Sequence, residues 1–257
     1  MAFFRYMTKA QIYRHVERLR RAFGIAPEDY PLGMADLRAL AKGRAELRVH
    51  VFDSATLGAY MIKNPPPRRS LIVLNGRRPP LSQAFDLAHE LVHFYTHPAG
   101  NFFCEIPEDG KVRRDLPAME YQANQGAAEL LMPYRLVIPM AAELADAKRL
   151  WRDPAMERRL GEAVAERFRC SPWAGILRIG DLRHELAQFR DGAALDRVRV
   201  LSMTARCRMA GARDPMAYAK ASFALSYPKA MARQPMDQSE LRARDSAALR
   251  AYDKEYE

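Results

Sequence analysis

A polar stripe on an otherwise apolar helix restricts the fold of this chain more than any other feature. Residues 83–97 have helical periodicity, and five side chains that can ionise or bind a metal fall within an arc of roughly 100°: Asp86, His89, Glu90, His93 and His97. The rest of the circumference is apolar, so most of this helix is predicted to be buried. Buried imidazoles and carboxylates without partners would destabilise the fold by several kcal/mol, whereas one divalent cation satisfies them together.

The stripe contains the spacing HExxH, with His89 and His93 four residues apart. On a helix these two residues lie one turn apart on the same face, so both imidazoles can bind one metal ion. Glu90 cannot reach that ion well, but its carboxylate can reach a water molecule on the ion and accept a proton. The spacing therefore predicts a metal site with a general base beside it.

A third ligand is needed, because a catalytic zinc site keeps three protein ligands and one open position. His97 cannot supply it, since a continuous helix would place it about 12 Å beyond His89. The longer pattern HExxHxxGxxH is not matched either, because Thr96 stands at its glycine and Ala99 at its last histidine. We therefore expect a carboxylate from the next predicted helix, residues 117–132.

Glu120 is the best candidate on that second helix. Ala123 and Ala127 share its face at i+3 and i+7, and small side chains there let the two helices approach closely. Asp115 and Glu129 are the alternatives.

The rest of the chain predicts a small sheet among helices. Helices are expected at residues 8–23 and 34–42, and strands at residues 47–51, 57–62 and 71–74. Residues 101–116 are expected to form a charged loop beside the site, and residues after 190 to be mostly helical. The fold class is thus α+β, with a three-stranded sheet next to the two site helices. The strand 57–63, if it is the sheet edge, could pair with an extended substrate.

Composition favours a globular protein of the reducing cytoplasm. The chain has 257 residues, of which 49% are hydrophobic, and its net charge is +10. Its three cysteines, Cys104, Cys170 and Cys207, show no CxxC spacing, so neither a disulfide framework nor a zinc ribbon is expected. Its first residues lack an apolar export signal, and no stretch is long enough to span a membrane.

Three blocks of sequence resemble the bacterial ImmA/IrrE family of metallopeptidases. They are FDLAHELVHFYTH at 85–97, EYQANQGAAELLMP at 120–133, and a similar third block at 163–182. The resemblance implies a zincin-like fold in which His89, His93 and Glu120 bind zinc and Glu90 is the catalytic base. Manganese also suits imidazole and carboxylate ligands. Gly126 departs from the family, which usually has an aromatic residue there.

The resemblance ends near residue 187 and suggests three segments. We expect a metallopeptidase domain at 1–150, a helix-turn-helix-like segment at 151–190 and a helical extension at 191–257. A chain ending at Leu186 is accordingly expected to fold. The second helix of the middle segment offers Trp173, Arg178 and Arg183 for DNA contact, which is a small set for reading bases.

Further residues could assist the chemistry. Asp86, on the same stripe, could orient a histidine ligand. The negative charge that develops on a substrate oxygen needs a donor, and the candidates are Tyr60, Tyr95, His97 and Tyr134.

These features support three functions. The first is a cytoplasmic zinc endopeptidase of narrow specificity which, by resemblance, cleaves a cognate helix-turn-helix repressor and so induces stress-response or mobile-element genes. The second is a DNA- or protein-binding regulator whose metal is structural. The third is a zinc hydrolase of a non-protein substrate. Glu90 favours an enzyme, because a structural site needs no base and usually has a fourth protein ligand.

Overall fold

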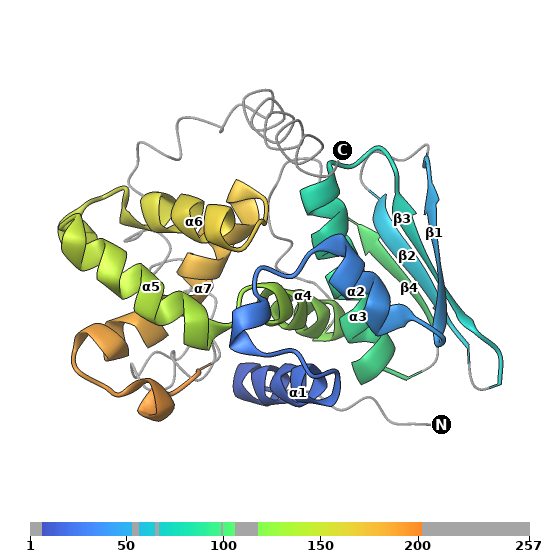
Figure 1. Ribbon diagram of the computed structural model, residues 1–257, viewed down its shortest axis with the longest axis horizontal. Helices are drawn as coiled ribbons and strands as arrows, with labels where there is room; N and C mark the ends of the chain where they lie inside the picture. Colours follow the sequence, from blue (N-terminus) through green and yellow to red (C-terminus); the bar gives the residue numbers. More distant parts are fainter. Residues whose placement is uncertain (1–6, 53–56, 65–66, 99, 106–117, 202–257) are drawn as a thin grey trace. The chain divides into compact units, whose positions relative to one another are not determined.

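The computed structural model describes residues 7–52, 57–64, 67–98, 100–105 and 118–201. In chain order (Figure 1) its elements are α1 (Lys9–Ala22), a 3-10 turn at Pro27–Asp29, α2 (Met34–Ala41), β1 (Ala45–His50), β2 (Leu57–Lys63), β3 (Ser70–Asn75), α3 (Pro80–Thr96), β4 (Gly100–Glu105), α4 (Ala118–Leu131), α5 (Tyr134–Ala147), a 3-10 turn at Leu150–Arg152, α6 (Met156–Arg167), α7 (Pro172–Arg190) and a 3-10 turn at Leu195–Arg197.

The chain divides into two compact units. The first contains residues 1–7, 11–133 and 167–171, and therefore most of α1, the sheet, α3 and α4. The second contains residues 8–10, 134–166 and 172–257, and therefore α5, most of α6, and α7. The functional boundaries at residues 150 and 190 stay a prediction.

The sheet of the first unit has four strands in the order β1-β3-β2-β4. Strand β1 is parallel to β3, and β2 is antiparallel to both of its neighbours. The α+β class is confirmed, and the three predicted strands are all present. The fourth strand, β4, lies where we expected the start of a loop, and the rest of that loop, 106–117, lies outside the described residues.

The position of β2 corrects one expectation. Strand β2 is interior, because its two edges pair with β3 and β4. It cannot add an extended substrate to the sheet, since strand addition needs an unpaired edge. Among the described strands the edges belong to β1 and β4.

Helices α2 and α3 cover one face of this sheet (Figure 1). The core between helices and sheet is made of large apolar side chains that are fully buried: Leu37, Met61, Ile72, Leu74, Leu87 and Leu91. Strand β3 carries apolar side chains on both faces, and its two edges pair with β1 and β2. Helix α3 packs against it. Helix α3 is thereby held rigidly along its buried length.

Helices α3 and α4 pack closely, and Gly126 makes this possible. A Cβ atom at Gly126 would lie only 2.7 and 2.9 Å from the two γ-carbons of Val92. The residue that departs from the family pattern therefore gives Val92 the space that a side chain would fill. The carboxyl end of α4 is anchored separately, since Glu129 pairs with Arg20 and the Tyr30 hydroxyl donates to the Leu130 carbonyl at 2.8 Å.

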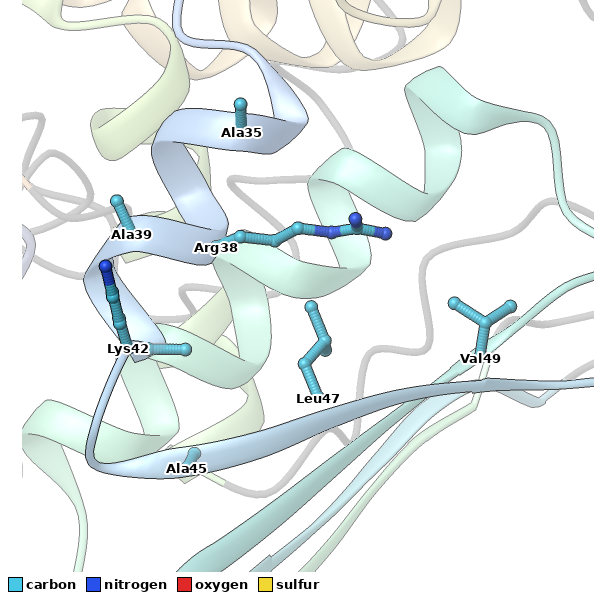
Figure 2. Close-up of a pocket in the computed structure, with 8 residues that line it drawn as sticks. Ala35, Arg38, Ala39, Lys42, Ala45, Leu47 and Val49 are labelled. Atoms are coloured by element: carbon cyan, nitrogen blue, oxygen red, sulfur yellow. The ribbon is translucent and has the colours of Figure 1, made fainter.

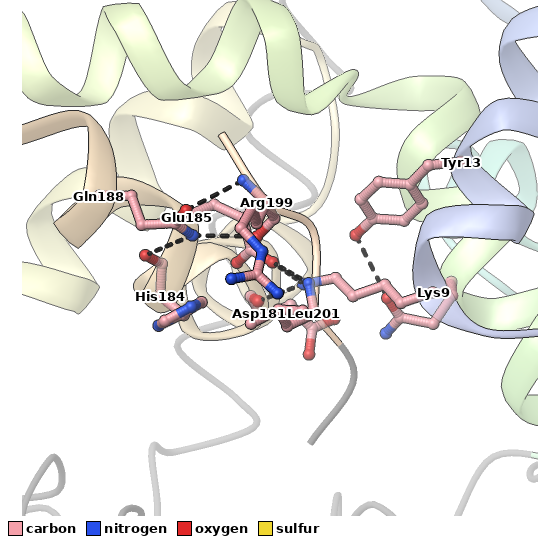
Figure 3. Close-up of polar contacts among 9 residues, drawn as sticks. Lys9, Tyr13, Asp181, His184, Glu185, Gln188, Arg199 and Leu201 are labelled. Carbon is pink, nitrogen blue, oxygen red and sulfur yellow. Dashed lines mark hydrogen bonds and ion pairs between the residues drawn. The ribbon is translucent and has the colours of Figure 1, made fainter. Parts of the chain in front are cut away.

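In the second unit, helices α6 and α7 cross at two glycines. A Cβ at Gly175 would lie 2.1 Å from the Gly161 carbonyl oxygen, so only glycine fits. Figure 3 shows a polar cluster around the later part of α7, where the Lys9 ammonium contacts the buried Glu185 carboxylate at 3.2 Å.

The chain after α7 returns along that helix. The Leu201 amide donates to Glu185 at 3.1 Å, and the Gln188 side chain exchanges two hydrogen bonds with the Arg199 backbone (Figure 3). A chain ending at Leu186 would lose all three contacts. Our expectation that such a chain folds is untested, and an end point after Leu201 keeps these contacts.

Candidate metal centre

Helices α3 and α4 bring three donor side chains together. The Nε2 atoms of His89 and His93 are 3.0 Å apart. The Glu120 carboxylate faces both nitrogens, with Oε2 3.1 Å from His89 Nε2 and Oε1 3.3 Å from His93 Nε2. One donor atom from each residue lies within 4.8 Å of the others, so a single ion could contact all three.

Two imidazole nitrogens and one carboxylate oxygen are the donor set of many catalytic zinc sites, which leave the fourth position open. Both histidines are fully buried, whereas the Glu120 side chain is 18% exposed. The cluster therefore has a solvent-facing side, at its carboxylate.

Glu90 shows that this cluster suits a metal ion with its water. Its carboxylate is fully buried, and neither oxygen has a hydrogen-bond partner within the described parts of the chain. A buried charged group without a partner is strongly destabilising. A water molecule on an ion in this cluster would supply the missing donor, so the residues fit the group.

Electrostatics give His93 and Glu120 the protonation states that metal ligands need. Burial, together with His89 and His97, lowers the pKa of His93 to about 4, so this ring is neutral at pH 7. Burial alone would raise the pKa of Glu120, but hydrogen bonds and charge from the two histidines hold it well below its usual range. Neutral imidazole and ionised carboxylate are the states that bind metal.

The pKa values of Glu90 and His89 are shifted upward instead. Burial raises the pKa of Glu90 to about 8, with smaller contributions from the charges of Glu120 and Asp86. Burial lowers the pKa of His89, but Glu120 and the other carboxylates outweigh it and raise the net value. A cation in the cluster would oppose both upward shifts, because it disfavours a charged imidazole and favours an ionised carboxylate.

Both histidines of the cluster also have partners for their second ring nitrogen. His89 Nδ1 lies 3.0 Å from the Asn124 amide oxygen, and His93 Nδ1 lies 2.8 Å from His97 Nδ1. Sequence reasoning missed Asn124. It follows Glu120 by four residues, so it shares a face of α4 with that carboxylate, and this spacing was the available signal.

Residues 45–175 match the family of M78 peptidases whose domain is described as IrrE N-terminal-like. The chain belongs to this family. The match covers the whole sheet, α3 and α4, and so includes His89, Glu90, His93 and Glu120. It confirms the resemblance to ImmA/IrrE metallopeptidases. The comparison with curated proteins found no match.

Family membership makes this M78 chain a metallopeptidase by class, so its substrate is a protein or peptide. The cluster of two histidines and Glu120 is the group in the described chain that could hold the metal ion. No helix among the described residues is long and apolar enough to cross a membrane.

The alternative third ligands are placed elsewhere. Glu129 is buried with Arg20, whose guanidinium also donates to the Glu129 carbonyl at 2.9 Å. Asp115 lies outside the described residues.

Asp86 pairs with a cation rather than with a histidine. Its Oδ2 accepts a hydrogen bond from Arg78 Nε at 2.6 Å, and its side chain is 2% exposed. Burial raises the pKa of Asp86, while the Arg78 charge lowers it. This M78 chain therefore uses Asp86 to join the start of α3 to the loop after β3.

The four residues predicted to donate a hydrogen bond to the substrate oxygen lie in different parts of the structure. Tyr95 donates its hydroxyl hydrogen to the Leu40 carbonyl, facing α2 instead of the metal cluster. Tyr60 lies on β2, with its ring 5.7 Å from that of Phe52. Tyr134 begins α5 in the second unit, whereas the metal cluster belongs to the first. Of the four, His97 is the candidate whose side chain contacts the metal cluster, through His93 Nδ1.

A separate hollow of about 480 Å³ lies between α2 and β1 (Figure 2). Its lining mixes small or apolar side chains with two basic ones, namely Ala35, Arg38, Ala39, Ala41, Lys42, Ala45, Leu47 and Val49. It includes none of the metal-cluster residues. We therefore do not assign it to the peptidase site.

The helix-turn-helix-like segment is poorly suited to reading DNA bases. Arg178 is 1% exposed, and Arg183 pairs with Glu157. Both arginines that we expected to face DNA are thus engaged within the protein.

Proposed function

We propose that this M78 peptidase is a zinc-dependent endopeptidase of narrow specificity that uses Glu90 as its general base. The observation that carries the proposal is the buried Glu90 carboxylate, which has no partner among the described residues and follows the ligand His89 directly. A structural metal site has no use for such a group, whereas water activation requires it.

In this proposal His89, His93 and Glu120 hold the metal. A bound zinc ion would lower the pKa of a water molecule and polarise the scissile carbonyl. Glu90 accepts a proton from the attacking water on its carboxylate, and then gives that proton to the nitrogen of the leaving amine. Burial favours this transfer, because the carboxylate is screened from bulk water.

The expected substrate is a cognate helix-turn-helix repressor in the cytoplasm, whose cleavage would induce stress-response or mobile-element genes. Unrestricted cleavage of cytoplasmic proteins would be toxic, so the substrate should present an extended segment. Strand β4 supports this, since it is an edge of the described sheet and begins four residues after α3 ends. An extended segment could pair with it by strand addition.

The decisive experiment compares the wild type with Glu90→Gln. This change keeps shape and hydrogen bonding but removes the base. We expect unchanged metal content by elemental analysis and at least a 100-fold loss of cleavage, because general-base assistance contributes about 10²–10⁴-fold. Glu28→Gln is the matched control, since Glu28 is exposed on the 3-10 turn after α1. Zinc, manganese and cobalt should each be tested in the metal-free protein.

Co-expression with a candidate helix-turn-helix repressor gives the cellular test. Loss of the repressor band with wild type, but not with Glu90→Gln, supports the peptidase. Equal loss with both proteins contradicts the role of Glu90. Relief of repression without any cleavage would favour the second candidate, a DNA- or protein-binding regulator with a structural metal.

A further inference from the structure

The His97 ring bridges one ligand of the proposed metal site and an amide on the neighbouring helix. His97 Nδ1 lies 2.8 Å from His93 Nδ1, and His97 Nε2 lies 3.1 Å from the Gln122 amide oxygen. His93 and Gln122 are fully buried, and His97 is 3% exposed. Water therefore does not compete for these contacts, and the order of protons along them is set by the protein.

The positions of the protons on the two rings follow from the His93 nitrogen that would bind the metal. Its Nε2 faces His89 and Glu120, so this nitrogen must keep its lone pair for a metal. A neutral imidazole carries one N–H, which must then be on Nδ1. His93 Nδ1 donates to His97 Nδ1, and His97 carries its own proton on Nε2. That proton meets the Gln122 amide oxygen, which is an acceptor.

The opposite order fails at both ends. If His97 Nδ1 donated to His93, the His93 proton would move to Nε2 and point at the place of the metal. His97 Nε2 would then be an acceptor facing the Gln122 oxygen, which is also an acceptor. Only the first order is compatible with a bound metal.

The backbone holds His97 in place for this contact. Its amide donates to the His93 carbonyl at 3.0 Å, so it continues the hydrogen bonding of α3 by one residue. The Lys63 ammonium, at the end of β2, donates to the carbonyls of Phe94 and His97. A positive charge at the carboxyl end of a helix is stabilising, and here it fixes the turn that carries His97.

We propose that His97 and Gln122 are positioning residues that hold His93 in the tautomer able to bind metal. This inference rests on the proposed metal site. It gives His97 a role different from that of a donor to the substrate. The partners of ligand histidines typically change metal affinity by about 10–100-fold when they are removed.

Two measurements on the full chain test the proposal. The first is the zinc dissociation constant, from competition with a chromophoric chelator. The second is long-range ¹H–¹⁵N NMR of the histidine rings in metal-free protein, which reports which nitrogen carries the proton. We expect the proton on Nδ1 of His93 and on Nε2 of His97.

Paired substitutions separate positioning from packing. His97→Phe keeps a ring but removes the acceptor, and should weaken zinc binding about 10–100-fold. His97→Gln restores an amide oxygen that can accept from His93, and should recover most of the affinity. Gln122→Met should mix the two tautomers of His97 and weaken binding less. Gln125→Met is the matched control on α4, because Gln125 contacts Tyr13 at 3.3 Å and not the cluster.

Each outcome decides the matter. Wild-type affinity and an unchanged His93 tautomer in His97→Phe would overturn the proposal. If His97→Phe does not fold, as judged by circular dichroism, Gln122→Met decides the question. A changed His97 tautomer in that variant supports the positioning role, whereas an unchanged tautomer together with unchanged zinc affinity overturns it. If the wild type binds no metal, the proposed function fails, whereas the tautomers are still measured in the same metal-free sample.

Discussion

Replacing Gly126 with alanine should push α3 and α4 apart and so loosen the metal cluster. The new methyl carbon would lie 2.7, 2.9 and 3.3 Å from three atoms of Val92, where ordinary contacts begin near 3.4 Å. Val92 is 2% exposed and β-branched, so it has essentially one rotamer in a helix and cannot turn away. The helices themselves must move.

The expected cost can be worked from two opposing effects. Overpacking a close-packed core costs about 1–3 kcal/mol, whereas alanine is favoured over glycine in a helix by about 1 kcal/mol. Because two γ-carbons are overlapped at once, the clash should win by about 1–2 kcal/mol. The donor atoms of His89 and Glu120 lie on opposite helices, so zinc affinity should fall as well.

A double-mutant cycle with Val92→Ala tests this reasoning. That change alone removes two buried methyl groups and should cost about 1.6 kcal/mol or more, at about 0.8 kcal/mol per group. With Gly126→Ala it relieves the overlap, so the two costs should not add, and the coupling should exceed about 1 kcal/mol in urea unfolding. Additive costs, or Gly126→Ala with wild-type stability and zinc affinity, would refute the close contact.

Three further predictions concern buried groups away from the cluster. Lys9→Met removes the buried ion pair between Lys9 and Glu185 and should lower the free energy of unfolding by about 3–5 kcal/mol, with partial recovery in Lys9→Met/Glu185→Gln. Burial raises the pKa of Cys170 to about 12, so iodoacetamide at pH 8 should label it only after unfolding, as read by peptide mass spectrometry. Burial also raises the pKa of Tyr30 from 10.0 to about 12. The contribution of Tyr30 to the free energy of unfolding is therefore complete below pH 10 and is lost as the pH rises towards 12. Tyr30→Phe should flatten the dependence of the free energy of unfolding on pH in this range.

The periodicity of α3 predicted most of what lies near the site. A helix that is apolar on most sides must be buried, and it carries its polar groups to one place whatever surrounds it. The structure accordingly brings His89 and His93 together with Glu120. Glu120 could be predicted from the sequence as well, because small residues such as Ala123 on its face of the helix indicate close packing against another helix.

The order of the strands could not be obtained in this way. Pairing in a sheet joins residues that are distant in the chain, and alternating patterns show which face is buried but not which strand lies beside it. Strand β2 therefore looked equally suitable for an edge or an interior position. Strand β4 was missed because its six residues are followed by a long charged stretch, which dominated the pattern of residues 101–116.

The hydrogen bonds that orient the histidine rings could not be predicted from the sequence, for a different reason. Asparagine and glutamine on a buried helix face give no periodic signal, yet Asn124 and Gln122 accept hydrogen bonds that fix the rings around the cluster. These polar groups are satisfied, as buried groups in a stable fold usually are. Glu90 differs, since its buried carboxylate has no partner within the described chain although α3 surrounds it with well-packed neighbours. Folding alone would favour an apolar residue there, and a purely structural metal site would as well. In the proposed function this carboxylate has a transient partner, the water molecule that is consumed in hydrolysis.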